Sequence, residues 1–515
     1  KLYRVEYNKL YRVEYNKLYR VEYNKLFKMD EINNMDIMLD ATKMHKTTEI
    51  YTDIEKIMLD LETKIDKNAI HLIKQNSMYD GAYLYTLNRY RNLLLNEVKQ
   101  YNSSLDINID NSITTNSTPL TIETKEVDLY LLKRMKEHYF PGLIKTCQGI
   151  ANIPLIEQKT PEWFKLRETM ISASDAGYFL NKCGMSRAIS SLKIKVGVSS
   201  YVSSSAPPLM HGNTYEDVSR AIYESRNSVS VTEYGILRSP TECIGASPDG
   251  IITACHKDTY ECQSKYGRLL EIKNPYSREI DTTVKPEYMV QILQQQYTTQ
   301  IPICDFVETT IVDINCHAYS SNNKPYTSLD EMLADKLDMS NPNWVKRIKN
   351  KNIPKENLNK MGYEKGLVIW YKKRFSDVDI RHKYVLYPLD ASYDKDSIEK
   401  WTIDMNGENF KDDFIFVTIK YWRLDVYSEK TVVYDAKLYE GEYIPKLCSA
   451  WNDICKCKEI GLNNGNIENY IEELEKTSSS VFYNPNKKPA RAKKQKFTNS
   501  DLNIYNPTNS IELDF

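Results

Sequence analysis

The stretch GRLLEIKNP at residues 267–275 decides the fold, because its apolar run predicts a buried strand that ends in charged side chains. Upstream, residues 244–253 read IGASPDGIIT and predict a second strand with Asp249 at its edge. Glu271 and Lys273 lie two positions apart, so their side chains share one face of their strand. A carboxylate and an ammonium placed in this way can act together on one bound ligand.

The acidic side chains on these two strands predict a metal site. If the strands are neighbours, Asp249 and Glu271 bring two carboxylates together, and these repel unless a cation lies between them. Hard oxygen ligands with open positions suit Mg²⁺ or Mn²⁺, which hold a phosphate and activate water. Lys273 would then orient the attacking water or lower its pKa. The alternative is a surface hairpin with a Glu–Lys ion pair, and the E-x-K pattern alone favours that alternative.

A helix is predicted upstream of both strands, where residues 209–225 read LMHGNTYEDVSRAIYES. It is expected to begin near Asn213, whose side chain can cap it. Its apolar face consists of Tyr215, Val218 and Ile222. Glu216 lies on another side of the helix and, taken alone, is an ion-pair partner for Arg220 one turn later.

Residues 160–180, TPEWFKLRETMISASDAGYFL, predict a phosphate site. They place Arg167 before Ser174, which lies at the head of a predicted helix. A helix N-terminus with a hydroxyl and a nearby guanidinium can bind a phosphate. Plain N-capping by Ser172 or Ser174 is the alternative, and the two interpretations are compatible.

A further helix is predicted downstream, in KPEYMVQILQQQYTT at residues 285–299, with Pro286 in its first turn. One stripe of this helix consists of Tyr288, Gln291 and Gln295. A second, mostly apolar stripe consists of Met289, Ile292, Leu293 and Gln296.

Taken in order along the chain, these pieces resemble the lambda-exonuclease/YqaJ branch of the PD-(D/E)XK nucleases. The resemblance rests on PEWFKLR…ISASD, HGNTYE, SPDG, LEIKNP and YMVQ, and covers residues 160–310. It implies an α+β (α/β/α-like) fold, a restriction-endonuclease-like core with a mixed central sheet. The long additions on both sides resemble versions in large DNA viruses. In these a strand followed by a Trp-containing helix, here KYWRLDVY…PKLCSAWNDI, extends the nuclease domain.

The resemblance assigns roles to the residues of the predicted metal site. Asp249, Glu271 and Lys273 match the catalytic D…E-x-K. Glu216 matches the helix acid that completes the metal site, and Ile272 would lend its backbone carbonyl.

The resemblance also assigns roles outside the metal site. Arg167 and Ser174 match the pair that grips a terminal 5′-phosphate in the exonuclease members. Gln291 matches the first Gln of the family's Q-x-Q helix and is expected to be a catalytic residue. The chain departs from the pattern at the second Gln, where Leu293 stands, which puts the role of that second Gln in doubt.

The function that the resemblance implies is a Mg²⁺- or Mn²⁺-dependent nuclease, a 5′→3′ exonuclease on double-stranded DNA that leaves 5′-phosphates and serves viral recombination, repair or replication. A structure-specific endonuclease and an RNA-degrading relative are the alternatives within the enzyme class. A DNA-binding recombination module with the nuclease fold is the non-enzymatic alternative, against which the intact set of four metal-site residues argues. Partners other than DNA stay open, namely a single-strand annealing protein and a second copy of the chain.

Length and composition bound these expectations. The 515 residues are too many for one ordinary core, so we expect one large domain with additions, or two to three domains. The formal net charge of −1 means that any DNA-binding surface is local. Ten cysteines without paired spacings fit a reducing, intracellular compartment, which for a viral protein is the host cytoplasm or nucleus. No stretch approaches the roughly eighteen apolar residues of a membrane span, so no membrane partner is expected.

Changes in composition and in apolar patterning along the chain predict five regions. An octapeptide repeat of little structure occupies residues 1–32 and begins with KLYRVEYN three times over. A helical region with a linker follows at 33–145, then the nuclease core at 146–320 and its C-terminal extension at 321–470. The last region, 471–515, is a basic and disordered tail.

Two further patterns have plain explanations beside functional ones. Cys243, Cys255, His256 and Cys262 could in principle bind zinc, but their spacing fits no zinc finger, and free thiols are the default. The run KKPARAKKQK in the tail fits a nuclear-localisation signal or a DNA tether, and equally a solvated end of the chain.

Overall fold

The computed structural model describes residues 124–156, 160–199, 206–239, 243–315, 324–335, 365–373, 382–407 and 414–484, together with residues 52, 54–57 and 340. The predicted octapeptide repeat, the linker and the KKPARAKKQK run lie outside the described residues. The chain divides into two compact units. Unit 1 consists of Lys1–Lys145 and Cys255–Tyr266, and unit 2 consists of Thr146–Ala254 and Gly267–Phe515.

Unit 1 is helical where it is described. Helix α7 (Thr124–Arg134) continues through the π-helical segment η2 (Met135–Tyr139) into α8 (Phe140–Ala151), as the apolar periodicity predicts. The last six residues of α8 belong to unit 2. The short helix α13 (Tyr260–Gln263) also belongs to this unit. Phe140 packs edge-on against Tyr266, with ring centroids 5.6 Å apart, and both rings are buried.

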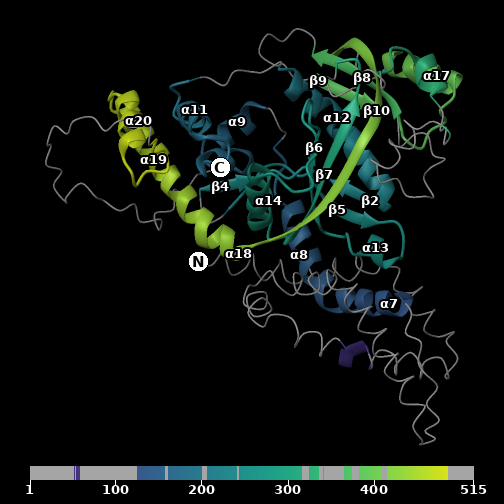
Figure 1. Cartoon of the computed structure of the whole chain (residues 1–515), viewed down its shortest axis with the longest axis horizontal. Helices are drawn as coiled ribbons and strands as arrows, with labels where there is room; N and C mark the ends of the chain where they lie inside the picture. Colours follow the sequence, from purple (N-terminus) through teal and green to yellow (C-terminus); the bar gives the residue numbers. More distant parts are fainter. Residues whose placement is uncertain are drawn as a thin grey trace, which may run out of the picture. The chain divides into compact units, whose positions relative to one another are not determined.

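Unit 2 is built on a seven-stranded sheet with the order β2-β5-β6-β7-β10-β8-β9 (Figure 1). The strands of its first half are β2 (Val229–Thr232), β5 (Gly250–Cys255), β6 (Leu269–Lys273) and β7 (Ile303–Val312). Strands β5 and β6 pair antiparallel, whereas β6 and β7 pair parallel. The sheet is therefore mixed and helices accompany it, which confirms the predicted α+β class with a mixed central sheet.

Strand β7 forms the middle of the sheet, and every one of its residues is buried. A strand covered on both faces is expected to be apolar throughout, yet β7 contains Asp305 and Glu308. Each of these carboxylates is paired with a buried or half-buried cation, Asp305 with Arg268 at 3.0 Å and Glu308 with Arg278 at 2.5 Å. The pairing explains how charge is tolerated in the core.

A smaller three-stranded sheet with the order β1-β4-β3 lies beside helix α14 (Pro286–Thr299). Its strands are β1 (Ile171–Ser172), β3 (Leu237–Arg238) and β4 (Ile244–Ala246). The helices before it along the chain and around it are α9 (Pro161–Arg167), α10 (Ala173–Phe179), α11 (Met185–Lys195) and α12 (Pro207–Asn227). Strand β4 leads directly to Asp249, so this sheet positions one end of the candidate site.

Helix α12 differs from the prediction at its start. It begins at Pro207, six residues before the predicted cap Asn213, which lies inside the helix. Proline suits the first position of a helix because it has no N–H to leave unpaired and its φ is already helical. The face of α12 that was predicted to be apolar is buried, and the helix ends at Ser228, whose φ is 55°.

The second half of the sheet belongs to the predicted C-terminal extension. Its strands are β8 (Lys365–Lys373), β9 (His382–Leu386) and β10 (Phe414–Val433), which all pair antiparallel. Strand β10 is twenty residues long, and it pairs with β7 through one part and with β8 through the other. Figure 1 shows it running along the whole sheet, from the end near α17 (Lys395–Gly407) to α18 (Ala436–Leu438).

Trp422 of β10 and Gly366 of β8 face one another in the register of these strands. The indole is fully buried and lies so close to Gly366 that a Cβ atom there would come within 2.7 Å of the ring. A second apolar core lies around β8 and includes Tyr326, Met332 of α15 (Leu329–Ala334) and Ile398. The extension therefore has its own core and shares a sheet with the predicted nuclease core.

The chain continues after β10 as helices. These are α18, the π-helical segment η5 (Tyr439–Tyr443), α19 (Ile444–Leu462) and α20 (Ile467–Lys476). The predicted boundary of a disordered tail at residue 471 is wrong, because α20 runs past it and the described residues extend to 484. Asn466 caps α20, and Ile471 and Leu474 are buried, so the helix is amphipathic and packed.

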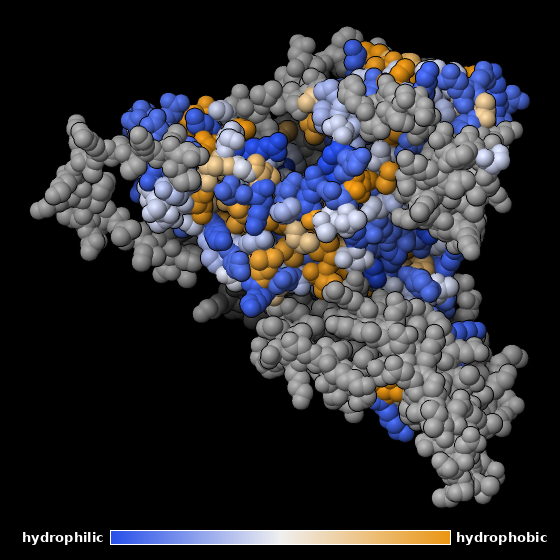
Figure 2. Space-filling model, viewed as in Figure 1, coloured by the Kyte–Doolittle hydropathy of each residue, from blue (hydrophilic) through white to orange (hydrophobic). Residues whose placement is uncertain are grey.

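The surface of the described residues mixes polar and apolar side chains. On the face seen in Figure 2, hydrophilic residues (blue) and hydrophobic residues (orange) are interspersed. None of the helices in the described ranges is both long enough and apolar enough to cross a membrane.

Candidate active site

The two strands that were predicted to carry the site are neighbours. Gly250 of β5 pairs with Leu270 of β6, which brings Asp249, the residue before β5, beside the end of β6. The Oδ2 atom of Asp249 accepts a hydrogen bond of 2.7 Å from the backbone N–H of Ile272. This bond fixes the first carboxylate of the predicted D…E-x-K set against the strand that carries the other two residues.

Glu271 lies at the centre of the site, and its side chain is fully buried. The Oε1 atom accepts hydrogen bonds from the Lys273 ammonium and from Gln291 Nε2, the latter at 2.5 Å. The Oε2 atom accepts a hydrogen bond of 2.6 Å from Gln295 Nε2. Both carboxylate oxygens are therefore held by side chains of β6 and α14.

Gln295 is a site residue to which the sequence analysis gave no role. The Q-x-Q pattern draws attention to position 293, which is occupied by Leu293, buried in the core. The signal that could have found Gln295 is helical spacing, because positions 291 and 295 lie one turn apart on the same face. The structure brings both amides to one carboxylate.

Three carboxylates influence one another at this site. Burial, and after it the negative charges of Glu271 and Glu216, raise the pKa of Asp249 well above its usual range. Glu216 of α12 is half-buried. It lies close enough to Asp249 for its charge to raise the pKa of Asp249. Burial lowers the pKa of the Lys273 ammonium, but the charges of Glu271 and Asp249 outweigh this effect, and the net result is a raised pKa.

The chemistry of this donor set fits a divalent cation. Three acidic side chains and a backbone carbonyl offer hard oxygen ligands, and the mutual repulsion of the acids is what a cation would relieve. Within the described ranges, however, no three His, Cys, Asp or Glu side chains are gathered closely enough to enclose an ion. Instead, the Lys273 ammonium neutralises the charge of Glu271, and the amides of Gln291 and Gln295 donate hydrogen bonds to it.

The residues of the predicted phosphate pocket also lie together. Arg167, the last residue of α9, donates from Nη2 to the hydroxyls of Ser172 and Ser174 at 2.8 and 3.1 Å. Its guanidinium lies over the ring of Trp163, 4.6 Å from the centroid. Ser172 occupies the N-cap position of α10 but makes no side-chain capping bond, so plain N-capping by Ser172 is wrong. Its hydroxyl donates to Asp175 at 2.7 Å instead.

Asp175 is the anion of this pocket. It accepts from Arg167 at 3.1 Å and pairs with Lys195 of α11 at 3.0 Å. Burial alone would raise the pKa of Asp175, but the cations Lys195 and Arg167 outweigh it and hold the pKa below its usual range. Burial lowers the pKa of Lys195 against the opposing charge of Asp175. The pocket therefore carries two cations for one carboxylate.

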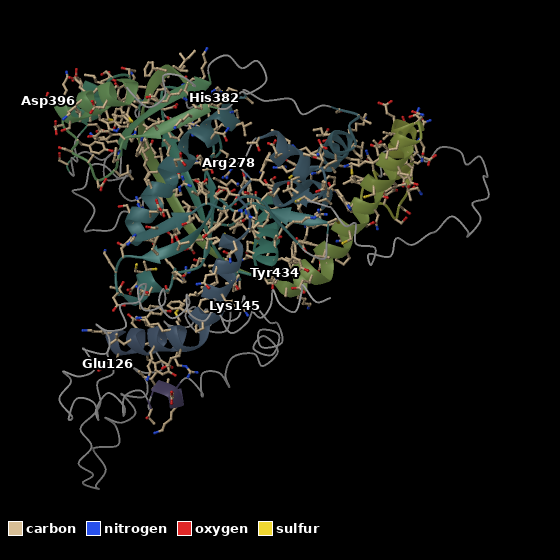
Figure 3. All side chains as sticks on the ribbon, turned by 180° about the vertical axis from the view of Figure 1, so that it is seen from behind. Glu126, Lys145, Arg278, His382, Asp396 and Tyr434 are labelled. Atoms are coloured by element: carbon tan, nitrogen blue, oxygen red, sulfur yellow. The ribbon has the colours of Figure 1, made fainter. Side chains whose placement is uncertain are left out.

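More basic side chains lie next to the site. The ammonium of Lys273 and the guanidinium of Arg278 both lie near the ring of Tyr288 on α14, 5.5 and 5.6 Å from its centroid. Glu308 pairs with Arg278 and, at 2.6 Å, with Lys430 of β10. Arg278 comes shortly after β6 in the sequence. Figure 3 shows it in the middle of unit 2, with His382 near one end of the sheet and Tyr434 near the other.

The cysteines of the weak zinc pattern are free thiols. Cys255 donates to the backbone carbonyl of Cys262 at 3.2 Å, an ordinary contact within unit 1. Cys243 belongs to unit 2.

Comparison with known proteins agrees with this geometry. Residues 162–302 match the family described as the YqaJ-like viral recombinase domain. The match confirms, for this part of the chain, the resemblance that the motifs predicted.

One relative comes from a large DNA virus. The chain is 27% identical over 355 residues to an uncharacterized protein of Acanthamoeba polyphaga mimivirus. The match covers 65% of this chain and 59% of the mimivirus protein. It extends well beyond the 141 positions from 162 to 302, so the likeness includes residues outside the nuclease region.

Two solved structures are similar to part of the chain. The alkaline exonuclease of Laribacter hongkongensis is 25% identical, and the match covers 29% of this chain and 74% of that protein with a TM-score of 0.23. The same enzyme in complex with dAMP is 27% identical, with coverages of 29% and 73% and the same TM-score of 0.23.

Proposed function

We propose that the protein is a divalent-metal-dependent nuclease that hydrolyses double-stranded DNA from a 5′ end and leaves 5′-phosphates. The observation that carries this proposal is the placement of Asp249, Glu271 and Lys273 together at the end of β6, with Glu216 near enough for its charge to act on Asp249. A protein that only binds DNA has no need of three carboxylates that repel one another, because they also repel the phosphate backbone.

Glu216, Asp249, Glu271 and the carbonyl of Ile272 would hold Mg²⁺ or Mn²⁺. When bound, the ion supplies a Lewis acid for the scissile phosphate. The chain's own residues do the rest. Gln291 and Gln295 keep the Glu271 carboxylate in one orientation, and the Lys273 ammonium is available to hold the attacking water or to neutralise charge on the phosphate.

The proposed 5′→3′ direction of digestion rests on the pocket around Arg167. Arg167, with the hydroxyls of Ser172 and Ser174, presents donors suited to a terminal phosphate dianion. Lys195 adds a second positive charge behind them. A duplex end that is held by its 5′-phosphate at this pocket would enter the site in one orientation only, which gives an exonuclease its polarity.

A specific observation favours a second candidate, a structure-specific endonuclease. The Arg167 guanidinium is already bonded to both serines and to Asp175, which is what a purely structural arginine would do. In that case ends would not matter, and branched or nicked DNA would be the substrate.

Digestion of matched substrates distinguishes the two candidates. The substrates are a linear duplex with a 5′-phosphate, the same duplex with a 5′-hydroxyl, and a closed circular duplex, each with Mg²⁺ and with EDTA. The exonuclease proposal expects the 5′-phosphate duplex to be degraded fastest, the circle to survive, and EDTA to stop the reaction.

Arg167→Ala should erase the preference for a 5′-phosphate, because it removes a charge-assisted contact worth about 1.5–3 kcal/mol. Arg238→Ala is the matched control, since Arg238 is an exposed arginine on β3 outside the pocket. Cutting of the circle as fast as the linear duplex, with no effect of 5′ chemistry, would move the endonuclease into first place.

The mimivirus relative supports a role in viral DNA metabolism, namely recombination, repair or replication inside an infected cell. We extend the proposal to a single-strand annealing protein as a partner, because an exonuclease of this polarity exposes the 3′-ended strand on which such a protein acts.

A further inference from the structure

Three consecutive glutamines in α14, Gln294, Gln295 and Gln296, are fully buried. Glutamine is mostly a surface residue, because a buried amide must replace the hydrogen bonds that it made to water. Successive residues of a helix point about 100° apart, so these three side chains leave α14 in three directions. Each reaches a different part of unit 2.

Gln294 and Gln296 each bind two backbone carbonyls. Gln294 Nε2 donates to Ile171 of β1 and Gly245 of β4, both at 2.8 Å. Gln296 Nε2 donates to Pro302, just before β7, at 2.8 Å and to Val432 of β10 at 2.9 Å. One amide therefore joins α14 to the small sheet that leads to Asp249, and the other joins it to the main sheet on the far side.

Gln295, between these two, points to the active site. Its Nε2 donates to Oε2 of Glu271 at 2.6 Å, while Gln291 takes Oε1. The orientation of the amide is settled by its partner, because a carboxylate oxygen can face only the NH₂ end. With its neighbours holding α14 against two sheets, Gln295 has little freedom to turn away.

Close packing does not explain these residues. The Oε1 atoms of Gln294, Gln295 and Gln296 are all buried without a hydrogen-bond partner. An unpaired buried carbonyl oxygen is unfavourable, and a methionine of similar volume would avoid it. The NH₂ contacts must therefore be what favours glutamine at these three positions.

We propose that Gln295 is a positioning residue, which orients the Glu271 carboxylate for metal binding, and that Gln294 and Gln296 fix the rotation of α14 so that Gln295 can do so. The inference rests on the proposed metal-dependent function. Leu293 occupies the position of the second Gln in the family's Q-x-Q pattern. The second amide that contacts Glu271 comes instead from Gln295, one helical turn after Gln291.

The test is Gln295→Met in the full chain, with Gln263→Met on α13 as the matched control, because the Gln263 amide donates to the backbone carbonyl of Lys257 at 3.0 Å rather than to Glu271. Gln296→Met is compared as a variant that acts on Glu271 only through the rotation of α14. Gln295→Met removes the donor to Glu271 but keeps the volume. We expect its affinity for Mn²⁺, measured by isothermal titration without DNA, to fall about 10–100-fold, the usual effect of losing a residue that orients a metal ligand. The kcat at limiting Mn²⁺ should fall similarly, the KM for duplex DNA should change little, and excess Mn²⁺ should restore the rate.

Gln296→Met loses two carbonyl contacts away from Glu271, so it should lower the melting temperature more than it lowers Mn²⁺ affinity. If Gln295→Met does not fold, Gln295→Asn replaces it, because asparagine keeps the amide on a side chain too short to reach Glu271. Unchanged Mn²⁺ affinity in the folded Gln295 variant, or an equal loss in Gln263→Met, would overturn the inference.

The outcome for the wild type separates this inference from the proposed function. A wild-type protein that binds Mn²⁺ but cuts no DNA would refute the proposed function, while the Mn²⁺ titration of the variants would still decide the role of Gln295. A wild-type protein that neither binds Mn²⁺ nor cuts DNA would refute both.

Discussion

The surroundings of Asp249 disfavour the charged form of its carboxylate. It is bonded to the backbone of Ile272, and the charges of Glu271 and Glu216 act on it. Asp249→Asn keeps the acceptor for the Ile272 N–H and removes one of three repelling charges. We expect cleavage to be abolished and DNA binding to stay within a few-fold of the wild type. The melting temperature in EDTA should rise by about 2–4 °C, as for about 1 kcal/mol.

Calorimetry in EDTA, a gel-based cleavage assay and a binding titration check the three parts of this prediction. Full activity of Asp249→Asn would remove Asp249 from the metal site. A melting temperature that falls would show that the carboxylate stabilises the fold through contacts other than those described above.

Lys273 bonds to Glu271, and its ammonium lies 5.5 Å from the centroid of the Tyr288 ring. Lys273→Gln should lower kcat by about 10²–10⁴-fold, the range for a group that assists proton transfer. Lys273→Arg should recover little, because a guanidinium is larger and spreads its charge. Single-turnover kinetics on a linear duplex measure this, with the exposed Lys456→Gln on α19 as the control. Near-normal turnover of Lys273→Gln would make Lys273 an ordinary ion-pair residue.

At the residue scale, spacing along the strands predicted which side chains would meet. Glu271 and Lys273 share a strand face, and Asp249 lies on the neighbouring strand. The contact of Gln295 was not predicted, because matching a family pattern directs attention to position 293. Which amide reaches Glu271 depends on the rotation of α14, and that is set by carbonyls of β1, β4 and β10 that are distant in the sequence.

At the element scale, one carboxylate joins three helices. Asp175 of α10 binds Arg167 of α9 and Lys195 of α11, whose ammonium also donates to the backbone carbonyls of Arg167 and Met170 at 2.8 Å. Asp175→Asn leaves two cations with no carboxylate between them, which should cost about 3–5 kcal/mol of unfolding free energy at neutral pH. Urea unfolding measures this, and a loss under about 1 kcal/mol would contradict it.

The pH dependence of this effect has a definite sign. The pKa of Asp175 is lowered in the folded protein, so its stabilising contribution is complete above the unfolded pKa of about 3.9 and is lost as the pH falls through the folded value. The difference in unfolding free energy between wild type and Asp175→Asn should be largest at neutral pH and should shrink below about pH 4. A difference that grows on acidification would be inconsistent with this ion pair.

Elements with a regular apolar pattern were predictable, and their ends were less so. In the C-terminal extension, the strand and the Trp-containing helix expected in KYWRLDVY…PKLCSAWNDI are β10 and α19. The start of α12 was misplaced because Asn213 is a good cap by composition, whereas Pro207 is fixed at the first turn by its own geometry. Local preference alone does not choose between two such signals.

At the scale of the whole molecule, residues 146–315 depend on the C-terminal extension to cover one edge of their part of the sheet, because β10 pairs with β7. Strand β7 is buried along its whole length because β10 covers one edge of it (Figure 1). Asp305 and Glu308 of β7 also depend on β10, through Thr431 at 3.0 Å and Lys430 at 2.6 Å. A fragment of residues 146–315 should therefore expose an apolar strand edge, lose one partner of each of these acids, and aggregate.

Size-exclusion chromatography and thermal unfolding test this prediction against a fragment of residues 146–484, which keeps β10 and the helices after it. The longer fragment should be soluble and should unfold cooperatively. A monomeric shorter fragment with a sharp unfolding transition would show that the nuclease region folds without its extension.

The close contact between Trp422 and Gly366 determines which residues of β10 and β8 pair with one another. A strand of twenty residues can slide along its partner, and each slip of one position turns its inward side chains outward. Only a residue without a Cβ leaves room for the indole, since a Cβ at Gly366 would approach the ring to 2.7 Å. A slip in either direction would set Trp422 against Lys365 or Leu367, where that room is missing. One glycine thus selects a single alignment of β10 on β8 within the C-terminal extension, so an error of alignment is rejected by steric exclusion while the chain folds.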